Sequence, residues 1–167
     1  MRKMLTTKAG ATFNLECPDA TFAVRKDVVE IIFKIKPGVF IVVNLARVDD
    51  NKGMLFVGWG NFWSRMTNEK LQLPKIEKCC PVLYEILTGK DKDGILEMEF
   101  GTSSENFEHG FGLQVDLSDK LPLHFCLNES IINKATLMRN RMLKVYNELV
   151  SNPPFPAWKS GIGEIWE

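Results

Sequence analysis

The sequence lacks net charge, because its 21 lysine and arginine residues balance its 21 aspartate and glutamate residues. A neutral chain has no overall field that would draw it to nucleic acid or to an anionic membrane surface. No segment approaches the roughly 20 consecutive apolar residues needed to cross a bilayer. The start of the chain, 1–8, is not followed by an apolar run of signal-peptide length. We therefore expect a cytoplasmic protein that binds neither nucleic acid nor membrane.

Cysteine and histidine are also scarce, with 4 and 2 residues respectively. The cysteines are scattered, and their spacing fits neither a disulfide framework nor a zinc site: Cys17, Cys79, Cys80 and Cys126. We interpret them as reduced, mostly buried thiols, and we expect no metal and no cofactor. Because no motif is specific enough to name a reaction, no catalytic residue is predicted.

The length and apolar content of the chain predict one ordinary hydrophobic core. At 167 residues and 45% hydrophobic composition, the default is a single domain, 1–167. Its last part, 152–167, combines prolines with large apolar side chains and cannot be helical. We interpret this part as a C-terminal strap whose aromatic residues pack on the domain itself or on a partner: Phe155, Trp158 and Trp166.

Alternating apolar and polar residues predict strands in two groups. The first group covers 27–60, with an amphipathic strand at 29–35, a turn at Lys36–Gly38 and an apolar run at 39–46 that we expect to be covered on both faces. A polar loop at 49–53 should then form a hairpin with 54–57, and a weaker strand is expected at 12–16. The second group should form a meander of three strands at 95–100, 111–117 and 121–127.

Two helices are predicted. Apolar residues recur at spacings of four and three near the C-terminus and form one stripe of an amphipathic helix over 130–150: Ile131, Ala135, Met138, Met142, Val145 and Leu149. A shorter helical segment should lie at 76–88, where Pro81 kinks or splits it and Gly89 ends it. The fold class expected is therefore α+β, with a largely antiparallel twisted sheet or half-open barrel, the long helix packed on one face and the second, short helix.

Two groups of side chains resemble a cysteine–histidine catalytic pair and a calcium loop, but their spacing fits neither. His124 and Cys126 lie two apart on an expected strand, but catalytic cysteine and histidine normally come from different elements. Asp91 and Asp93 precede Gly94 as in a calcium loop, yet the required first and last ligands would fall on Gly89 and Phe100. We interpret the first pair as a packed thiol beside a surface histidine and the second as a turn.

An aromatic cluster is the most plausible binding feature. Gly58 and Gly60 allow close approach of the backbone, and three large rings surround them: Trp59, Phe62 and Trp63. This cluster either fills the core at a corner of the sheet or lines a binding surface. Adding His109 and the aromatic residues of the tail gives the predicted binding residues: Trp59, Phe62, Trp63, His109, Phe155, Trp158 and Trp166.

For function, we favour a non-enzymatic protein-binding module that covers or inhibits another protein, as an immunity protein or a phage-encoded inhibitor does. The reason for this hypothesis is that the sequence lacks a catalytic or metal-binding motif and has surplus aromatic residues in its loops and tail. The alternative is a small-ligand-binding protein or enzyme, with a pocket between sheet and helix lined by Trp59 and Trp63. The partner should be another protein, and the chain itself a monomer or a homodimer.

Overall fold

A computed structural model of the chain describes residues 2–6, 12–16, 20–25, 27–58, 73–103, 106–117 and 121–152. The chain falls into two compact units. Unit 1 comprises Met1–Val57 and Leu113–Arg139, and unit 2 comprises Gly58–Gly112 and Asn140–Glu167. Two strands and one helix, introduced below, contribute residues to both units. The single domain expected from the chain length stays a prediction.

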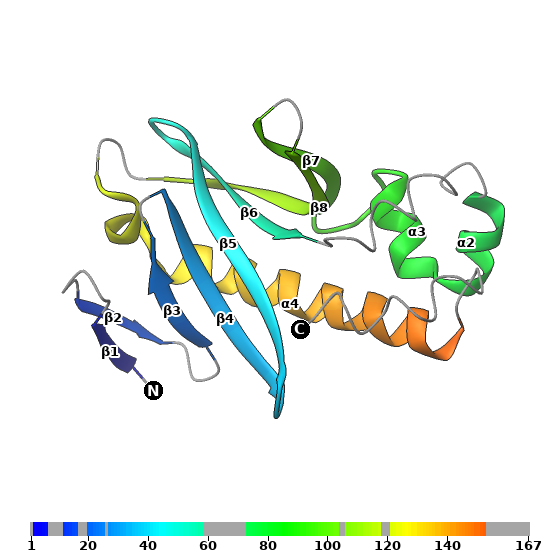
Figure 1. Cartoon of the computed structure of the whole chain (residues 1–167), viewed down its shortest axis with the longest axis horizontal. Helices are drawn as coiled ribbons and strands as arrows, with labels where there is room; N and C mark the ends of the chain where they lie inside the picture. The colour runs from blue at the N-terminus through cyan, green and yellow to red at the C-terminus, as the bar shows by residue number, and fades with distance from the viewer. Residues whose placement is uncertain are drawn as a thin grey trace. The chain divides into compact units, whose positions relative to one another are not determined.

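The described residues include eight strands, which form two antiparallel sheets (Figure 1). The small sheet pairs β1 (Arg2–Thr6) with β2 (Thr12–Glu16), the weaker strand that was predicted. The large sheet has the order β3-β4-β5-β6-β8-β7 and is not closed. Its strands are β3 (Ala20–Val24), β4 (Val28–Lys36), β5 (Val39–Asp49), β6 (Lys52–Gly58), β7 (Leu96–Ser103) and β8 (Asn106–Asp116). With the helices below, this architecture confirms the predicted α+β class.

In unit 1, the alternating sequence of β4 places one set of side chains in the core. Val29, Ile31 and Phe33 are buried, whereas Glu30 and Ile32 between them are half-buried. The prediction for the next strand was wrong in part. β5 lies inside the sheet, but only one of its faces is buried, through Ile41, Val43 and Leu45. An apolar run on both faces therefore does not require cover on both faces, because half-exposed apolar side chains are common on protein surfaces.

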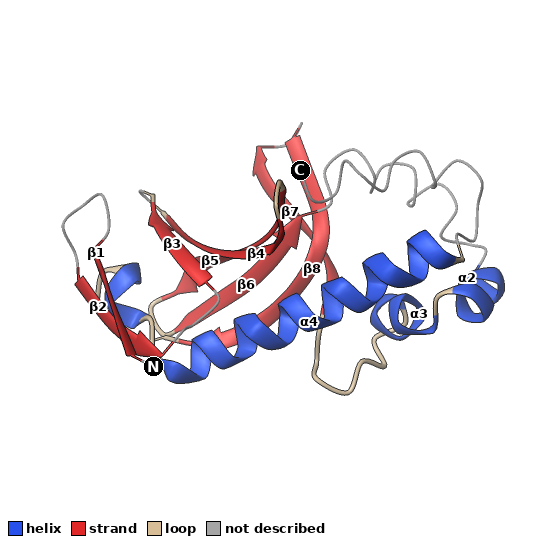
Figure 2. Ribbon diagram, turned by 90° about the horizontal axis from the view of Figure 1, so that it is seen from below, coloured by secondary structure: helices blue, strands red, loops and turns tan. Residues whose placement is uncertain are grey.

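Both predicted hairpin turns of unit 1 are present. Gly38, between β4 and β5, has a φ of 79°, a left-handed conformation that glycine adopts without strain. Between β5 and β6, the Asp49 carboxylate accepts a hydrogen bond of 3.0 Å from the Asn51 backbone N–H. β4 and β5 are long, twisted and bent (Figure 2).

The long helix, α4, spans Glu129–Ser151 and confirms the prediction for 130–150. The side chain of Asn128 caps its first turn by accepting the Ile131 backbone N–H at 2.9 Å. All six residues of the predicted apolar stripe are buried, Met138 in unit 1 and Met142 and Val145 in unit 2 among them. Within unit 1, the Arg139 guanidinium lies 4.9 Å from the centre of the Phe33 ring, which places α4 against β4.

In unit 2, the short helical segment consists of two helices, α2 (Leu73–Cys79) and α3 (Pro81–Leu87). Pro81 separates them, as predicted, and occupies the first turn of α3, where its missing N–H has no cost. Gly89 ends α3 with a φ of 72°. The N–H groups of Gly89 and Lys90 bind the carbonyl oxygens of Ile86 and Glu85, which together form a Schellman motif.

The third strand of the predicted meander, 121–127, was wrong. Residues Leu123–Cys126 form a short 3₁₀ helix, η1, and Pro122 precedes it in an extended conformation. The Phe125 N–H binds the Pro122 carbonyl oxygen at 2.9 Å, so the backbone pairs locally instead of with a neighbouring strand.

None of the described helices is both long enough and apolar enough to span a membrane.

Candidate functional site

Most of the predicted binding residues lie outside the part of the chain that the structure describes. These residues are Trp59, Phe62, Trp63, Phe155, Trp158 and Trp166. His109 lies on β8, where its backbone is opposite Glu99 of β7. The predicted binding residues therefore stay a prediction, and the described residues supply the candidate surfaces below.

The first candidate is the turn of residues 121–126 in unit 1, which we name the apolar turn. Leu121 and Phe125 are 45% and 56% exposed, and Pro122 between them is also exposed. The Phe125 ring lies 4.3 Å from the His124 ring, centre to centre. Large apolar side chains that cluster on a surface commonly mark an interaction site, whereas isolated ones do not.

Arg47 on β5 holds the apolar turn in place. One terminal nitrogen of its guanidinium donates a hydrogen bond of 2.7 Å to the Asp50 carbonyl oxygen, and the other donates one of 2.5 Å to the Leu121 carbonyl oxygen. The second nitrogen also lies 3.5 Å from the Cys126 sulfur. The planar fork of one arginine thus joins β5, the β5–β6 turn and the apolar turn, which a lysine ammonium could not reproduce.

The base of the apolar turn is buried although its tip is exposed. Cys126 and Leu127 are part of the core, and the Cys126 thiol points at the Leu121 and Pro122 carbonyl oxygens, 3.9 and 3.7 Å away. Beside this turn, the Leu117 N–H binds the Asn51 carbonyl oxygen at 2.9 Å. An exposed apolar tip on a buried, hydrogen-bonded base presents its side chains in a fixed arrangement.

Because η1 replaces the expected strand, the His124 and Cys126 side chains do not project from one face. In a 3₁₀ helix, positions two apart are turned by about 240° from each other. The Cys126 sulfur faces Arg47 and is buried. The interpretation of Cys126 as a packed thiol is consistent with this arrangement.

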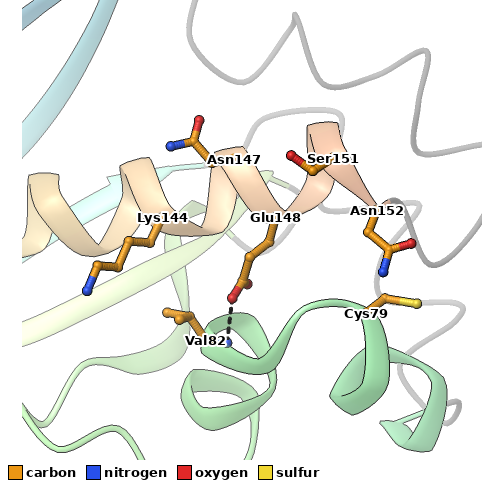
Figure 3. Close-up of a pocket in the computed structure, with 7 residues that line it drawn as sticks. All are labelled: Cys79, Val82, Lys144, Asn147, Glu148, Ser151 and Asn152. Carbon is orange, nitrogen blue, oxygen red and sulfur yellow. Dashed lines mark hydrogen bonds between the residues drawn. The ribbon is translucent and has the colours of Figure 1, made fainter.

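The second candidate is an open hollow in unit 2 with a volume of about 400 Å³ (Figure 3). Residues of α2, α3 and the end of α4 line it, together with Asn152 directly after α4: Cys79, Val82, Lys144, Asn147, Glu148, Ser151 and Asn152. Figure 3 shows the Glu148 side chain reaching toward Val82, while Asn147 and Ser151 point away from that carboxylate. The polar groups therefore do not converge on a common point, as they do in most small-molecule sites.

Glu148 has a structural role in this hollow. Its two carboxylate oxygens accept the backbone N–H groups of Val82 and Leu83, at 2.9 and 3.3 Å. Cys80, at the cap position of α3, makes no side-chain cap of its own, so Glu148 caps this helix from α4. Partial burial raises the pKa of Glu148 although the two N–H groups lower it. Both oxygens are already occupied, which leaves the carboxylate poorly placed to serve as a general base.

The adjacent Cys80 thiol is not an activated nucleophile. Burial, and next the charge of Glu148, raise the pKa of Cys80 to about 12. A nucleophilic cysteine requires a lowered pKa. The Cys80 sulfur instead lies 3.8 Å from the Asn152 carbonyl oxygen and packs in the core.

The Asp91–Asp93 segment is a turn, as the sequence indicated. One Asp91 carboxylate oxygen accepts the N–H groups of Asp93 and Ile95, at 3.0 and 3.1 Å. The other lies 3.5 Å from the Arg141 guanidinium, which also binds Asp93 at 3.2 Å. Arginine therefore occupies the position near these carboxylates that a cation would need. Across the described ranges, no group of three or more histidine, cysteine or acidic residues could hold a metal ion.

Sequence reasoning missed the residues that build the apolar turn. Apolar residues alternate at Leu121, Leu123, Phe125 and Leu127, and this alternation does not distinguish a strand from the observed turn. The local feature that opposes a strand is Pro122, which lacks a backbone N–H. Arg47 binds the backbone of Leu121, 74 residues away, and Glu148 binds the backbone of Val82, 66 residues away. Nothing near Arg47 or Glu148 in the sequence indicates these contacts.

Comparison with known protein families, with curated proteins and with solved structures finds no match for this chain.

Proposed function

We propose that the protein is a non-enzymatic protein-binding module that acts by covering or inhibiting another protein, as immunity proteins and phage-encoded inhibitors do. The observation that carries this proposal is the apolar turn, whose Leu121 and Phe125 side chains are exposed on a buried base. The reduced thiols expected from the sequence support a cytoplasmic location for this activity.

The geometry of the apolar turn suits protein binding for an energetic reason. Binding a partner costs the entropy of each side chain and loop that it immobilises, and a loop that is already held in place avoids much of this cost. The Arg47 guanidinium supplies that restraint by binding two backbone carbonyl groups. A few residues near the centre of an interface contribute most of its affinity, and aromatic residues are enriched at interfaces. Phe125 is therefore the principal anchor in this proposal.

The alternative, a small-ligand-binding protein or enzyme, receives less support from the described residues. The hollow of unit 2 has diverging polar side chains and a carboxylate that already caps α3. The pocket proposed for Trp59 and Trp63 involves residues outside the described part.

The test is affinity capture from the native host with the tagged full-length chain, its Phe125→Ser variant and a matched control, Val150→Ser. Val150 is 50% exposed on α4, so its substitution removes a comparable apolar side chain elsewhere. We expect a stoichiometric protein partner with the original chain and with Val150→Ser, and at least a tenfold loss with Phe125→Ser, as for an interface hot spot of about 1.4 kcal/mol or more.

Circular dichroism and thermal unfolding of each variant serve as controls for folding. Exposed side chains make small contributions to stability, so all three proteins should unfold at similar temperatures. If a correctly folded chain captures no protein partner, or captures the same partner after Phe125→Ser, the proposal is wrong.

A further inference from the structure

The β5–β6 turn, which contains two acidic residues, is joined to the apolar turn. Arg47 binds the carbonyl oxygens of both Asp50 and Leu121, so one guanidinium joins the β5–β6 turn directly to the apolar turn. Asp49 and Asp50 in that β5–β6 turn are exposed. Two exposed acidic residues therefore lie in the turn that Arg47 joins to the apolar turn.

The two positively charged side chains described beside the β5–β6 turn, Arg47 and Lys52, each have hydrogen-bond partners. The Lys52 ammonium donates a hydrogen bond of 2.5 Å to the Asp116 carboxylate, which lowers the pKa of Asp116. The Arg47 guanidinium directs its donors at backbone carbonyl oxygens. The Asp49 carboxylate accepts only a backbone N–H among the described groups, and no described side chain binds the Asp50 carboxylate. Among these five charged groups, the three carboxylates of Asp49, Asp50 and Asp116 outnumber the two cations, so this described part of the surface carries a net negative charge.

We propose that the apolar turn docks onto a protein surface whose apolar centre is bordered by lysine or arginine side chains. This inference rests on the proposed function and adds the chemistry of the partner to it. Complementary charge at the rim of an interface mainly speeds association and selects the correct partner, while the apolar centre supplies most of the affinity. Phe125 and Leu121 fill the centre, and Asp49 and Asp50 face the basic border.

The same charges disfavour other occupants of this surface. In a symmetric dimer formed through the apolar turn, Asp49 and Asp50 of one copy would lie near the same residues of the other, because both copies use the same patch. Like charges in close contact oppose association. An anionic membrane or a nucleic acid would meet the same repulsion.

The test uses defined probes and the full-length, ¹⁵N-labelled chain. One probe is a synthetic amphipathic helical peptide of leucine and lysine, whose apolar stripe is bordered by ammonium groups, and the other is the same peptide with glutamate in place of lysine. Titrations followed by NMR give both the site and the dissociation constant. We expect the leucine–lysine peptide to shift the backbone signals of 121–127, and the leucine–glutamate peptide to bind at least tenfold more weakly.

Two sets of variants separate the apolar and the charged contributions. Phe125→Ser should weaken binding of the leucine–lysine peptide more than tenfold. The paired change Asp49→Asn and Asp50→Asn should weaken binding of this peptide about 2- to 30-fold, since each of the two rim charges contributes about 0.2–1 kcal/mol. It should also reduce the salt dependence of that binding. Asparagine keeps the oxygen that accepts the Asn51 N–H, so the turn is retained. Glu77→Gln on α2, another exposed acidic residue, is the charge control.

Each outcome has a definite meaning. Equal binding of both peptides, with loss after Phe125→Ser, overturns the basic border and leaves a protein-binding turn. If the peptide shifts NMR signals only outside residues 121–127, or shifts none, this docking surface is wrong. The affinity capture from the host tests the proposed function separately. Concentration-dependent sedimentation of the chain alone, abolished by Phe125→Ser, would show that a second copy occupies the surface and would also overturn the proposal.

Discussion

Each unit contains a charged side chain that holds the backbone of a distant segment, and the two side chains have opposite charge. Arg47 in unit 1 donates to the carbonyl oxygens of Asp50 and Leu121. Glu148 in unit 2 accepts the N–H groups of Val82 and Leu83. Arginine stays ionised throughout the pH range of folded proteins, whereas a half-buried glutamate titrates within it.

The two contacts also serve different surfaces. The segment that Arg47 holds exposes Leu121 and Phe125, whereas the helix that Glu148 caps buries Leu83 and Ile86. The same kind of polar contact thus presents apolar side chains to solvent in unit 1 and supports a core in unit 2. Variants of unit 2 should therefore lower stability, while variants of Arg47 should change the local order of the apolar turn.

The largest effect is expected at a third polar contact, between Arg141 and Asp91 in unit 2. Both side chains are buried, so Arg141→Met would leave an uncompensated carboxylate in the core. We expect a loss of about 3–5 kcal/mol in the free energy of unfolding, measured by urea denaturation. The double variant Arg141→Met with Asp91→Asn should recover part of the lost unfolding free energy, because the buried charge is then absent. A loss below about 1 kcal/mol would show that water solvates Asp91.

Next in size is the removal of the α3 cap. Glu148→Ala leaves the N–H groups of Val82 and Leu83 without their acceptor and should cost about 1–2 kcal/mol of unfolding free energy. Glu77→Ala on the exposed side of α2 is the matched control and should change stability by less than about 0.5 kcal/mol. Equal effects of the two substitutions would contradict the capping role.

The pH dependence of stability should also reveal Glu148. Burial raises its pKa in the folded state, so the folded chain binds this proton more tightly than the unfolded chain does. The stability that it contributes is therefore fully present below the unfolded pKa of glutamate, about 4.3, and is lost as the pH rises through the raised folded pKa.

Denaturation of the original chain and of Glu148→Gln across this pH range measures that contribution. The difference in unfolding free energy should favour the original chain most at acidic pH and should decline as the pH rises. A difference that grows with rising pH would mean that the two N–H groups outweigh burial.

The smallest change in global stability is expected for Arg47→Lys. A single ammonium cannot bind two carbonyl groups in the geometry of the guanidinium, but the turn that it serves is exposed, so the loss should be about 0.5–1 kcal/mol. Hydrogen exchange should nevertheless accelerate at the Phe125 amide, which binds the Pro122 carbonyl oxygen. Exchange in the buried stripe of α4, at Val145, is the internal reference and should not change.

Much of the fold follows from local patterns in the sequence. The stripe of α4, the alternation of β4, the Gly38 turn and the division of the short helix at Pro81 each rest on residues close together in the chain. In these elements, propensity, periodicity and turn chemistry point to the same structure, which is the condition under which sequence reasoning succeeds.

The parts that sequence reasoning missed depend on contacts distant in the chain. Residues 121–127 alternate as a strand would, yet Arg47 binds Leu121 from 74 positions away and η1 forms in its place. The cap of α3 likewise comes from Glu148, 66 positions after Val82. Neither partner has a sequence signal, because an arginine or glutamate on a polar position is ordinarily solvated.

The most direct test of the protein-binding turn is photo-crosslinking in the native host. A benzophenone amino acid replaces Phe125 in one variant and Val150 in the other, both in the full-length chain. Our account predicts a discrete covalent adduct with a protein partner from position 125 and no such adduct from position 150. The absence of an adduct at 125, or the same adduct at both positions, would contradict it.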